Sequence, residues 1–281
     1  MPVHFAHLKA LGVDLQGQAP AVIRIIEEAR AAGQDVTADQ YPWLASGTQL
    51  DSALLPRWAI DGGHDALIKR LDDPATLAKI RAEMADNLRR RGGAESLLLT
   101  DTDAPWTGQR LSALARVWNL DPRDAALRVI REAPTKTSAA SFNMIDADVD
   151  LIMKQPWVVT GSDGSEGHPR QYATFPKKYA VYVRQRKLIS LRDFIRHSTG
   201  LTADMFKLDH RGYLRAGYYA DVVVFDPATY APKADYLHPR ELSVGVSELL
   251  VNGASAIGGG KITGAAAGRA LRRKPTGGCP V

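Results

Sequence analysis

The 281-residue sequence predicts an α/β protein built on a parallel sheet, followed by a smaller, strand-rich C-terminal part. Near the N-terminus a strand, a helix and a second strand follow one another with short links, which is typical of a βαβ unit. Later helices carry N-cap signals and apolar stripes. After about residue 206 the pattern changes to short strands and turns, so we expect one region over 1–205 and another over 206–281.

The predicted βαβ unit occupies the first 42 residues. A strand is expected over 3–8, and a helix over 21–32, where apolar side chains recur at helical spacing. Gly33 is suited to end that helix because it tolerates a left-handed backbone. The second strand covers 35–39 and ends before Pro42, which lacks the N–H group that a sheet requires.

The remaining elements follow from caps and apolar patterns. We expect helices that begin after Asp73, Asp121 and Ser190, a helix over 111–118, and strands over 96–100, 157–160, 219–226 and 247–253.

Composition excludes several classes of protein. The 36 basic and 31 acidic residues give a net charge of only +5, and no basic stripe with interleaved aromatic residues predicts nucleic-acid binding. The single cysteine, Cys279, excludes a disulfide framework and a cysteine-rich zinc site. No apolar run reaches the roughly 20 residues of a membrane span, and residues 1–4 lack the features of a signal peptide. We therefore expect a cytoplasmic protein without a membrane partner.

Three polar residues lie at the C-terminal ends of predicted parallel strands, where chemistry collects in α/β folds: His7, Asp39 and Asp163. His7 could be a metal ligand, a proton carrier or a satisfied core histidine. Asp163 is equally consistent with an active-site carboxylate and a turn-forming residue, and the turn-forming interpretation is preferred for Asp39. Arg170 could bind a carboxylate through two hydrogen bonds and Lys9 a substrate oxygen, although both could simply be solvated.

An ordered set of short motifs is similar to a known family. The motifs are His7-Leu8-Lys9, Asp39-Gln40-Tyr41-Pro42-Trp43, Ser46-Gly47-Thr48, Gly161-Ser162-Asp163-Gly164, His168-Pro169-Arg170, Thr174-Phe175-Pro176, His210-Arg211-Gly212, Gly217, the run from Ala220 to Pro227, and Val251-Asn252-Gly253. Together they resemble the C-terminal half of the N-acyl-D-amino-acid deacylases (D-aminoacylases) of the amidohydrolase superfamily. The resemblance spans essentially the whole chain. It departs from the family at His210, where an Asp is usual, at Trp43, where a Tyr is usual, and at Gly47, where a Ser is common.

The resemblance implies a partial TIM (β/α) barrel containing strands six to eight, with a helical insertion over about 44–110 and the C-terminal strands of a small β-sandwich. It also implies a Zn²⁺ cofactor and roles for individual side chains. On this basis His7 and Asp163 bind the metal, Asp163 is also the general base, Tyr41 donates to the oxyanion, and Lys9, Arg170 and Ser46 bind substrate.

The implied activity is metal-dependent hydrolysis of the amide bond of N-acyl-D-amino acids or related amides. Zinc needs about three or four protein ligands, and the resemblance finds only His7 and Asp163 here. The family's other ligands would lie upstream, in a half that is a separate polypeptide or has been lost. The alternative is a catalytically inactive half-barrel that binds a partner fragment or a second copy of itself. A hydantoinase or dihydroorotase relative is disfavoured by the Tyr-Pro and His-Pro-Arg segments.

Overall fold

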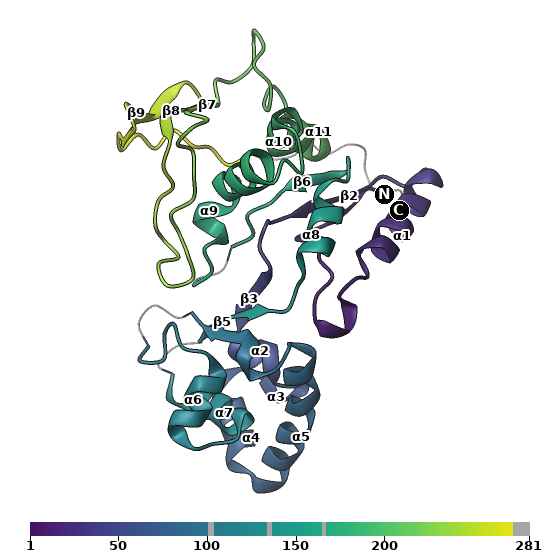
Figure 1. The fold of residues 1–281 in the computed structure, drawn as a ribbon, viewed down its shortest axis with the longest axis vertical. Helices are drawn as coiled ribbons and strands as arrows, with labels where there is room; N and C mark the ends of the chain where they lie inside the picture. The colour runs from purple at the N-terminus through teal and green to yellow at the C-terminus, as the bar shows by residue number, and fades with distance from the viewer. Residues whose placement is uncertain (101–103, 134–136, 165–166, 272–281) are drawn as a thin grey trace.

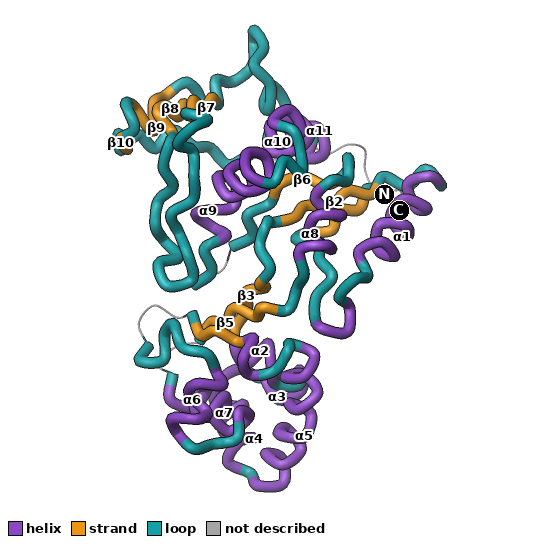
Figure 2. Tube along the Cα trace, viewed as in Figure 1, coloured by secondary structure: helices purple, strands orange, loops and turns teal. Residues whose placement is uncertain are grey.

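The structure is a computed structural model that describes residues 1–100, 104–133, 137–164 and 167–271. Figure 1 shows a helical lobe below a lobe that contains a parallel sheet, with the last strands at the upper edge. Figure 2 shows how helices, strands and loops alternate along the same trace. The α/β class predicted from the sequence is confirmed. No helix in the described ranges is long and apolar enough to cross a membrane.

The parallel sheet has three strands in the order β1-β2-β6. They are β1 (Val3–Phe5), β2 (Val36–Gln40) and β6 (Val158–Thr160). Helices α1 (Ala19–Ala31) and α8 (Asp146–Met153) pack on one face of the sheet. That core includes Ala19, Ile26, Val36, Ala38, Ile152, Trp157 and Val158. The expected βαβ unit is therefore present, and Gly33 has φ +86° just beyond the helix.

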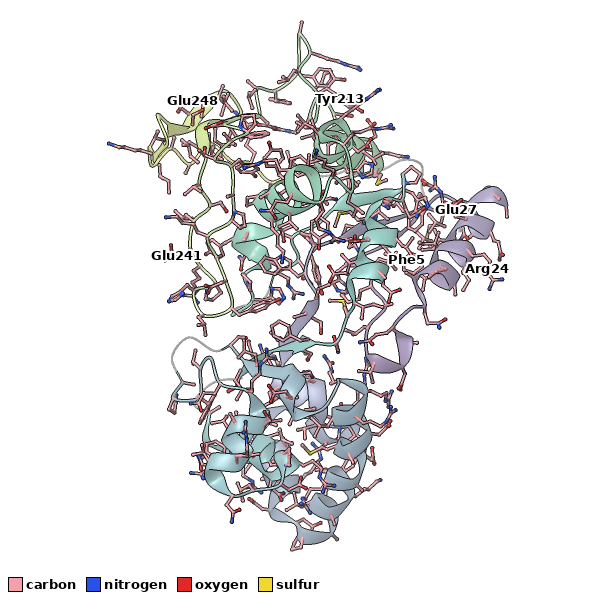
Figure 3. The ribbon with its side chains drawn as sticks, in the orientation of Figure 1. Phe5, Arg24, Glu27, Tyr213, Glu241 and Glu248 are labelled. Carbon is pink, nitrogen blue, oxygen red and sulfur yellow. The ribbon has the colours of Figure 1, made fainter. Side chains whose placement is uncertain are left out.

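Both outer strands of this sheet have an open edge among the described residues, because β1 and β6 each pair only with β2. Phe5 at the end of β1 is 46% exposed. It lies on the same side of the molecule as Glu27 and Arg24 of α1 (Figure 3). An edge strand of this kind offers unpaired backbone groups to another strand.

The helical lobe is formed by the stretch of chain that connects two antiparallel strands, and it extends beyond the insertion expected over about 44–110. Its sheet has the order β3-β5-β4, formed by β3 (Ala45–Gln49), β5 (Ser138–Phe142) and β4 (Leu97–Leu99). Its helices are α2 (Leu50–Leu54), α3 (Arg57–Ile60), α4 (Gly63–Asp72), α5 (Pro74–Arg90), α6 (Leu111–Trp118) and α7 (Pro122–Glu132). The last two helices and β5 share the lobe's core, so this lobe runs to Phe142 and not to about 110.

Three helices and one π-helix follow β6 along the chain. They are α9 (Arg170–Lys177), the π-helix Lys178–Gln185, α10 (Leu191–Ser198) and α11 (Gly200–Phe206). Helices α10 and α11 pack against β6. Two short 3₁₀ turns, Val13–Leu15 and Ala94–Ser96, occur earlier in the chain.

The C-terminal region forms one antiparallel sheet in the order β10-β9-β8-β7. Its strands are β7 (Val222–Phe225), β8 (Val246–Val251), β9 (Ala254–Gly258) and β10 (Lys261–Ile262). Phe225 contacts Tyr179 of the π-helix edge-on and Tyr230 contacts it at a tilt, at ring-centroid distances of 5.4 and 5.6 Å. The β-sandwich expected here stays a prediction, because the described part shows a single sheet.

Candidate active site

The carboxyl ends of the three parallel strands meet at one edge of the sheet. Beyond the strands the ladder continues, because Leu8 N donates to Asp39 O at 2.8 Å and Gly161 N donates to Gln40 O at 3.1 Å. The segments that follow each strand are therefore neighbours, as parallel strands require. This places His7, Asp39 and the turn of Asp163 at the same edge.

Asp39 links the first two strands. Its Oδ1 accepts from the backbone N of His7 at 2.9 Å, and its Oδ2 lies 3.0 Å from His4 Nε2. Asp39 is therefore more than the turn-forming residue preferred from the sequence. His4, which the sequence analysis did not select, holds its carboxylate. The pairing depends on strand register, so no local pattern could have indicated it.

Lys9 approaches the ring of His7. Its Nζ donates to His7 Nδ1 at 2.8 Å, so that nitrogen carries no proton. Burial, together with the nearby Arg170 guanidinium, lowers the pKa of Lys9 to about 8. Lys9 therefore exchanges its proton more readily than an exposed lysine does.

Asp163 pairs with Arg170. Asp163 Oδ2 lies 3.1 Å from Arg170 Nη1, and the Arg170 side chain is only 3% exposed. Asp163 has φ +52°, and its Oδ1 accepts from Gly164 N at 2.7 Å. Arg170 is the first residue of α9, and its Nη2 also donates to Gly47 O at 3.3 Å. Arg170 is thus a buried cation at the site and not a solvated surface residue.

His168 holds the backbone of Arg170 through a hydrogen bond. Its Nδ1 accepts from the backbone N of Arg170 at 3.1 Å, so its Nε2 carries the proton and donates to Ala45 O at 3.0 Å. Burial lowers the pKa of His168 to about 3, and Arg170 contributes to this effect. The ring is therefore neutral at physiological pH. The sequence analysis identified the His-Pro-Arg segment but predicted no role for His168.

Tyr41 has two cations close to its ring. Lys9 Nζ is 5.2 Å and Arg170 Cζ is 4.8 Å from the centroid of its ring. Burial raises the pKa of Tyr41 to about 12, so its hydroxyl keeps its proton and can donate a hydrogen bond. Ser46 is a buried residue of β3, and its Oγ makes no hydrogen bond within the described ranges. The structure thus groups Lys9, Tyr41, Asp163 and Arg170, whereas Ser46 is connected to them through its neighbours Gly47, which bonds Arg170, and Ala45, which bonds His168.

A zinc ion would need more ligands than this edge of the sheet offers. Among the residues that the structure describes, no three His, Cys, Asp or Glu side chains are placed to hold a metal ion. His7 and Asp163, the two expected ligands, are engaged with Lys9 and Arg170. The described residues therefore do not complete a zinc site by themselves.

Comparison with known proteins places the chain in a family. The profile of the amidohydrolase family matches residues 56–257. D-aminoacylase from Alcaligenes xylosoxydans xylosoxydans is 33% identical over 279 residues, which cover 97% of this chain and 49% of that protein. N-acyl-D-aspartate deacylase from the same organism is 32% identical over 256 residues, 89% of this chain and 43% of that protein. The chain thus spans about half the length of the curated relatives it matches, and the resemblance inferred from the motifs is confirmed.

Solved structures agree with this result. A D-aminoacylase crystal structure superposes with a TM-score of 0.75 at 32% identity, covering 97% of this chain and 50% of that one. N-acyl-D-glutamate deacylase from Bordetella bronchiseptica, solved with zinc and a phosphonate inhibitor, gives a TM-score of 0.71 at 29% identity over 91% of this chain and 46% of that one. By its sequence and by its fold, the chain belongs to the amidohydrolase family.

Proposed function

We propose that the chain forms the substrate-binding and proton-transfer half of a metal-dependent hydrolase that cleaves the amide bond of N-acyl-D-amino acids. The observation that carries the proposal is the ion pair between the buried Arg170 and the partly exposed Asp163, which lies beside Tyr41 and Lys9 where the parallel strands end. We infer that β1, β2 and β6 correspond to strands six to eight of a (β/α)₈ barrel. The C-terminal sheet would then belong to a small β-sandwich.

Arg170 is suited to bind the substrate carboxylate. A guanidinium can donate two parallel hydrogen bonds to a carboxylate. Because the Arg170 side chain is only 3% exposed, water competes little with the substrate carboxylate for its guanidinium. When a substrate carboxylate takes over this cation, Asp163 loses its partner and becomes free to accept a proton. Asp163 then carries the proton from the attacking water to the leaving amine.

Tyr41 and Lys9 would act on the amide oxygen. The Tyr41 hydroxyl stays protonated because its pKa is raised to about 12, so it can donate to the developing oxyanion. Lys9, held against the His7 ring, adds positive charge on the same side. Ser46 would bind substrate from β3.

Zn²⁺ would bind only where this chain is combined with the other half of the barrel. The relative from Bordetella bronchiseptica was solved in complex with zinc, and His7 and Asp163 would be this chain's share of the ligands. The remaining ligands would come from residues outside the described part of this chain, as the family resemblance implies. We propose that the protein acts in the cytoplasm.

Hydrolysis of N-acetyl-D-amino acids, compared with their L-enantiomers, tests the proposal. The assay uses the chain alone and the chain combined with the barrel half that carries the missing ligands, each with added zinc. Arg170→Lys should lower kcat/KM by about 100-fold because the bidentate contact is lost. Arg24→Lys on the exposed face of α1 is the matched control and should leave the rate unchanged. Equal rates for the two variants would contradict the role of Arg170.

A second candidate function is a catalytically inactive half-barrel that binds a partner fragment or another copy of the chain. The open edges of β1 and β6 favour it. Zinc content and light scattering of the purified protein separate the two candidates. Stoichiometric zinc together with hydrolysis supports the enzyme, whereas a stable complex that lacks both supports the binding function.

A further inference from the structure

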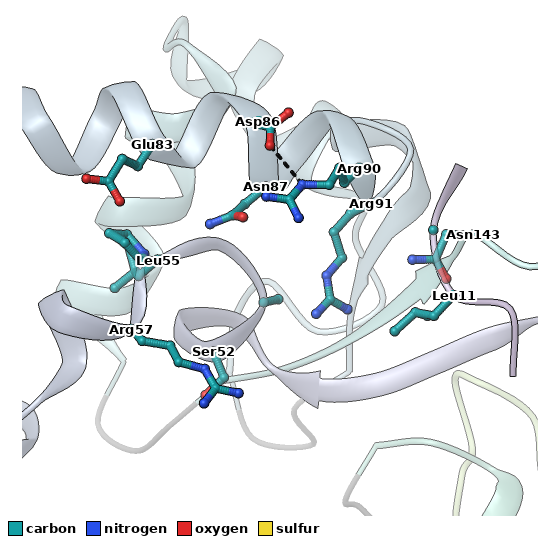
Figure 4. A pocket seen from close by; sticks show the side chains of 13 residues that line it. Leu11, Ser52, Leu55, Arg57, Glu83, Asp86, Asn87, Arg90, Arg91 and Asn143 are labelled. Atoms are coloured by element: carbon teal, nitrogen blue, oxygen red, sulfur yellow. Dashed lines mark hydrogen bonds and ion pairs between the residues drawn. The ribbon is translucent and has the colours of Figure 1, made fainter. Parts of the chain in front are cut away.

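A pocket of about 510 Å³ lies between the loop that follows β1 and the helical lobe (Figure 4). Leu11 and Gly12 form its wall on the loop side, and residues of α2, α3 and α5 form the opposite wall. Leu11 also packs against the apolar cluster that contains Tyr41. The pocket therefore lies next to the candidate active site, and Leu11 separates the two.

Arg91 reaches into the pocket directly after α5 (Figure 4). Its Nη1 donates to Ser141 Oγ at 3.3 Å, and no described carboxylate pairs with it. Arg91 is partly buried, and this burial lowers the pKa of its guanidinium. A desolvated cation bonded only to a neutral hydroxyl is costly unless an anion accompanies it.

Asn143 lines the same pocket and is 1% exposed. Within the described residues, neither Oδ1 nor Nδ2 of its carboxamide makes a hydrogen bond. Asn143 comes two residues after Ser141, and side chains two residues apart on extended backbone point to the same side. The Asn143 side chain therefore lies on the side where Ser141 bonds Arg91. A buried amide that lacks both partners is unusual in a native structure and indicates a missing ligand or water.

The acidic residues of the pocket are already engaged. Glu83 accepts from Trp58 Nε1 at 3.1 and 3.2 Å, and Asp86 pairs with Arg90 at 2.8 Å. Arg57 projects from the opposite wall, with no carboxylate partner among the described residues (Figure 4). Two cations, Arg57 and Arg91, therefore line the cavity without an ion-pair partner among the described residues.

We propose that this pocket binds a small organic acid, with Arg91 and Arg57 donating to its carboxylate and Asn143 to a neighbouring hydroxyl or amide group. The carboxamide can donate and accept at once, which matches a 2-substituted carboxylate better than a bare anion. The volume suits a small molecule of this size. The site is separate from Arg170 and does not depend on the proposed hydrolase activity.

Calorimetric titration of the full chain with malate, a 2-hydroxy dicarboxylate, tests the proposal. Arg91→Met and Asn143→Leu should each weaken binding at least about 10-fold, the cost of one charged or buried hydrogen bond. Arg116→Met on α6, away from the pocket, is the matched control and should bind as the parent does. The proposal fails if millimolar malate does not bind, if the variants match the control, or if equimolar phosphate displaces malate fully.

The thermal stability of the ligand-free variants provides an independent check. Because each substitution removes a group that has no adequate partner, Tm should stay unchanged or rise by a few degrees. A large fall in Tm for both variants, with no fall for Arg116→Met, would give these side chains a structural role and overturn the proposed site.

Discussion

His7 and Asp163 both hold left-handed backbone conformations directly after their strands, with φ values of +42° and +52°. Such conformations are unfavourable for residues other than glycine and persist only where neighbouring contacts fix them. Asp39 holds the first through the His7 amide, and Gly164 N bonds the side chain of the second. The two residues therefore depend on the packing at the strand ends.

Gly161 shows how tight this packing is. A Cβ atom added there would lie 2.3 Å from Asp39 Oδ1 and 3.0 Å from Asp39 Cβ. We predict that Gly161→Ala displaces the Asp39 carboxylate, breaks its bond to the His7 amide and destabilises the fold by about 1–3 kcal/mol. Urea unfolding measures the loss, and the NMR shift of the His7 amide reports the displacement. In Gly164→Ala the new Cβ has open space, so an equal effect there would refute the steric argument.

The sequence indicated His7, Asp163 and Arg170 as candidates because they lie at or beyond the ends of predicted strands, and their roles stay predictions. It could not supply their partners. His4 meets Asp39 across two strands, and His168 meets the carbonyl of Ala45 from another lobe. Contacts of this kind depend on register and on packing between lobes, which local patterns do not encode.

At the scale of the elements, helices with local signals were predicted well. Asp73, Asp121 and Ser190 each cap a helix in the structure through a side-chain oxygen. The elements that the sequence analysis missed lack such signals. Strand β5, for example, reads Ser-Ala-Ala-Ser-Phe and is a strand because β3 and β4 pair with it on both sides. Helix α9 contains Pro176, which argues against a helix in local terms.

Helix α10 offers a test of local capping. Ser190 Oγ accepts from Asp193 N at 3.0 Å, and at the far end of the helix Ser198 bonds Thr160 of β6. We predict that Ser190→Ala lowers the free energy of unfolding by about 1 kcal/mol because one amide at the helix start loses its acceptor. Ser190→Asn keeps an acceptor and should remain close to the parent in a denaturant titration. If the two variants are equally destabilised, the cap is not the cause.

At the scale of the whole molecule, the two lobes have separate apolar cores, joined by the connections around β3 and β5 (Figure 1). Between pH 7 and about 9 the folded and unfolded chains differ in bound protons chiefly at lysines, because carboxyl groups and histidines have already lost their protons and tyrosines still keep theirs. Burial lowers the pKa of Lys9 and of Lys177 to about 8, and that of Lys178 to about 7. The unfolded chain, with lysines near 10.5, binds more protons in this range, so stability should rise with pH.

Lys178 should dominate this dependence because it is fully buried and its Nζ bonds only the hydroxyl of Thr160 among the described residues, at 2.9 Å. We predict that Lys178→Met stabilises the fold by about 1–2 kcal/mol near pH 7, since no buried amine must be kept uncharged. The gain should shrink towards pH 10, where an unfolded lysine is also losing its proton. Urea titrations at pH 7, 8 and 9.5 measure the slope, with Lys154→Met, an exposed position, as the control. A parent and a Lys178→Met variant with parallel pH profiles would mean that this amine stays charged in the folded protein.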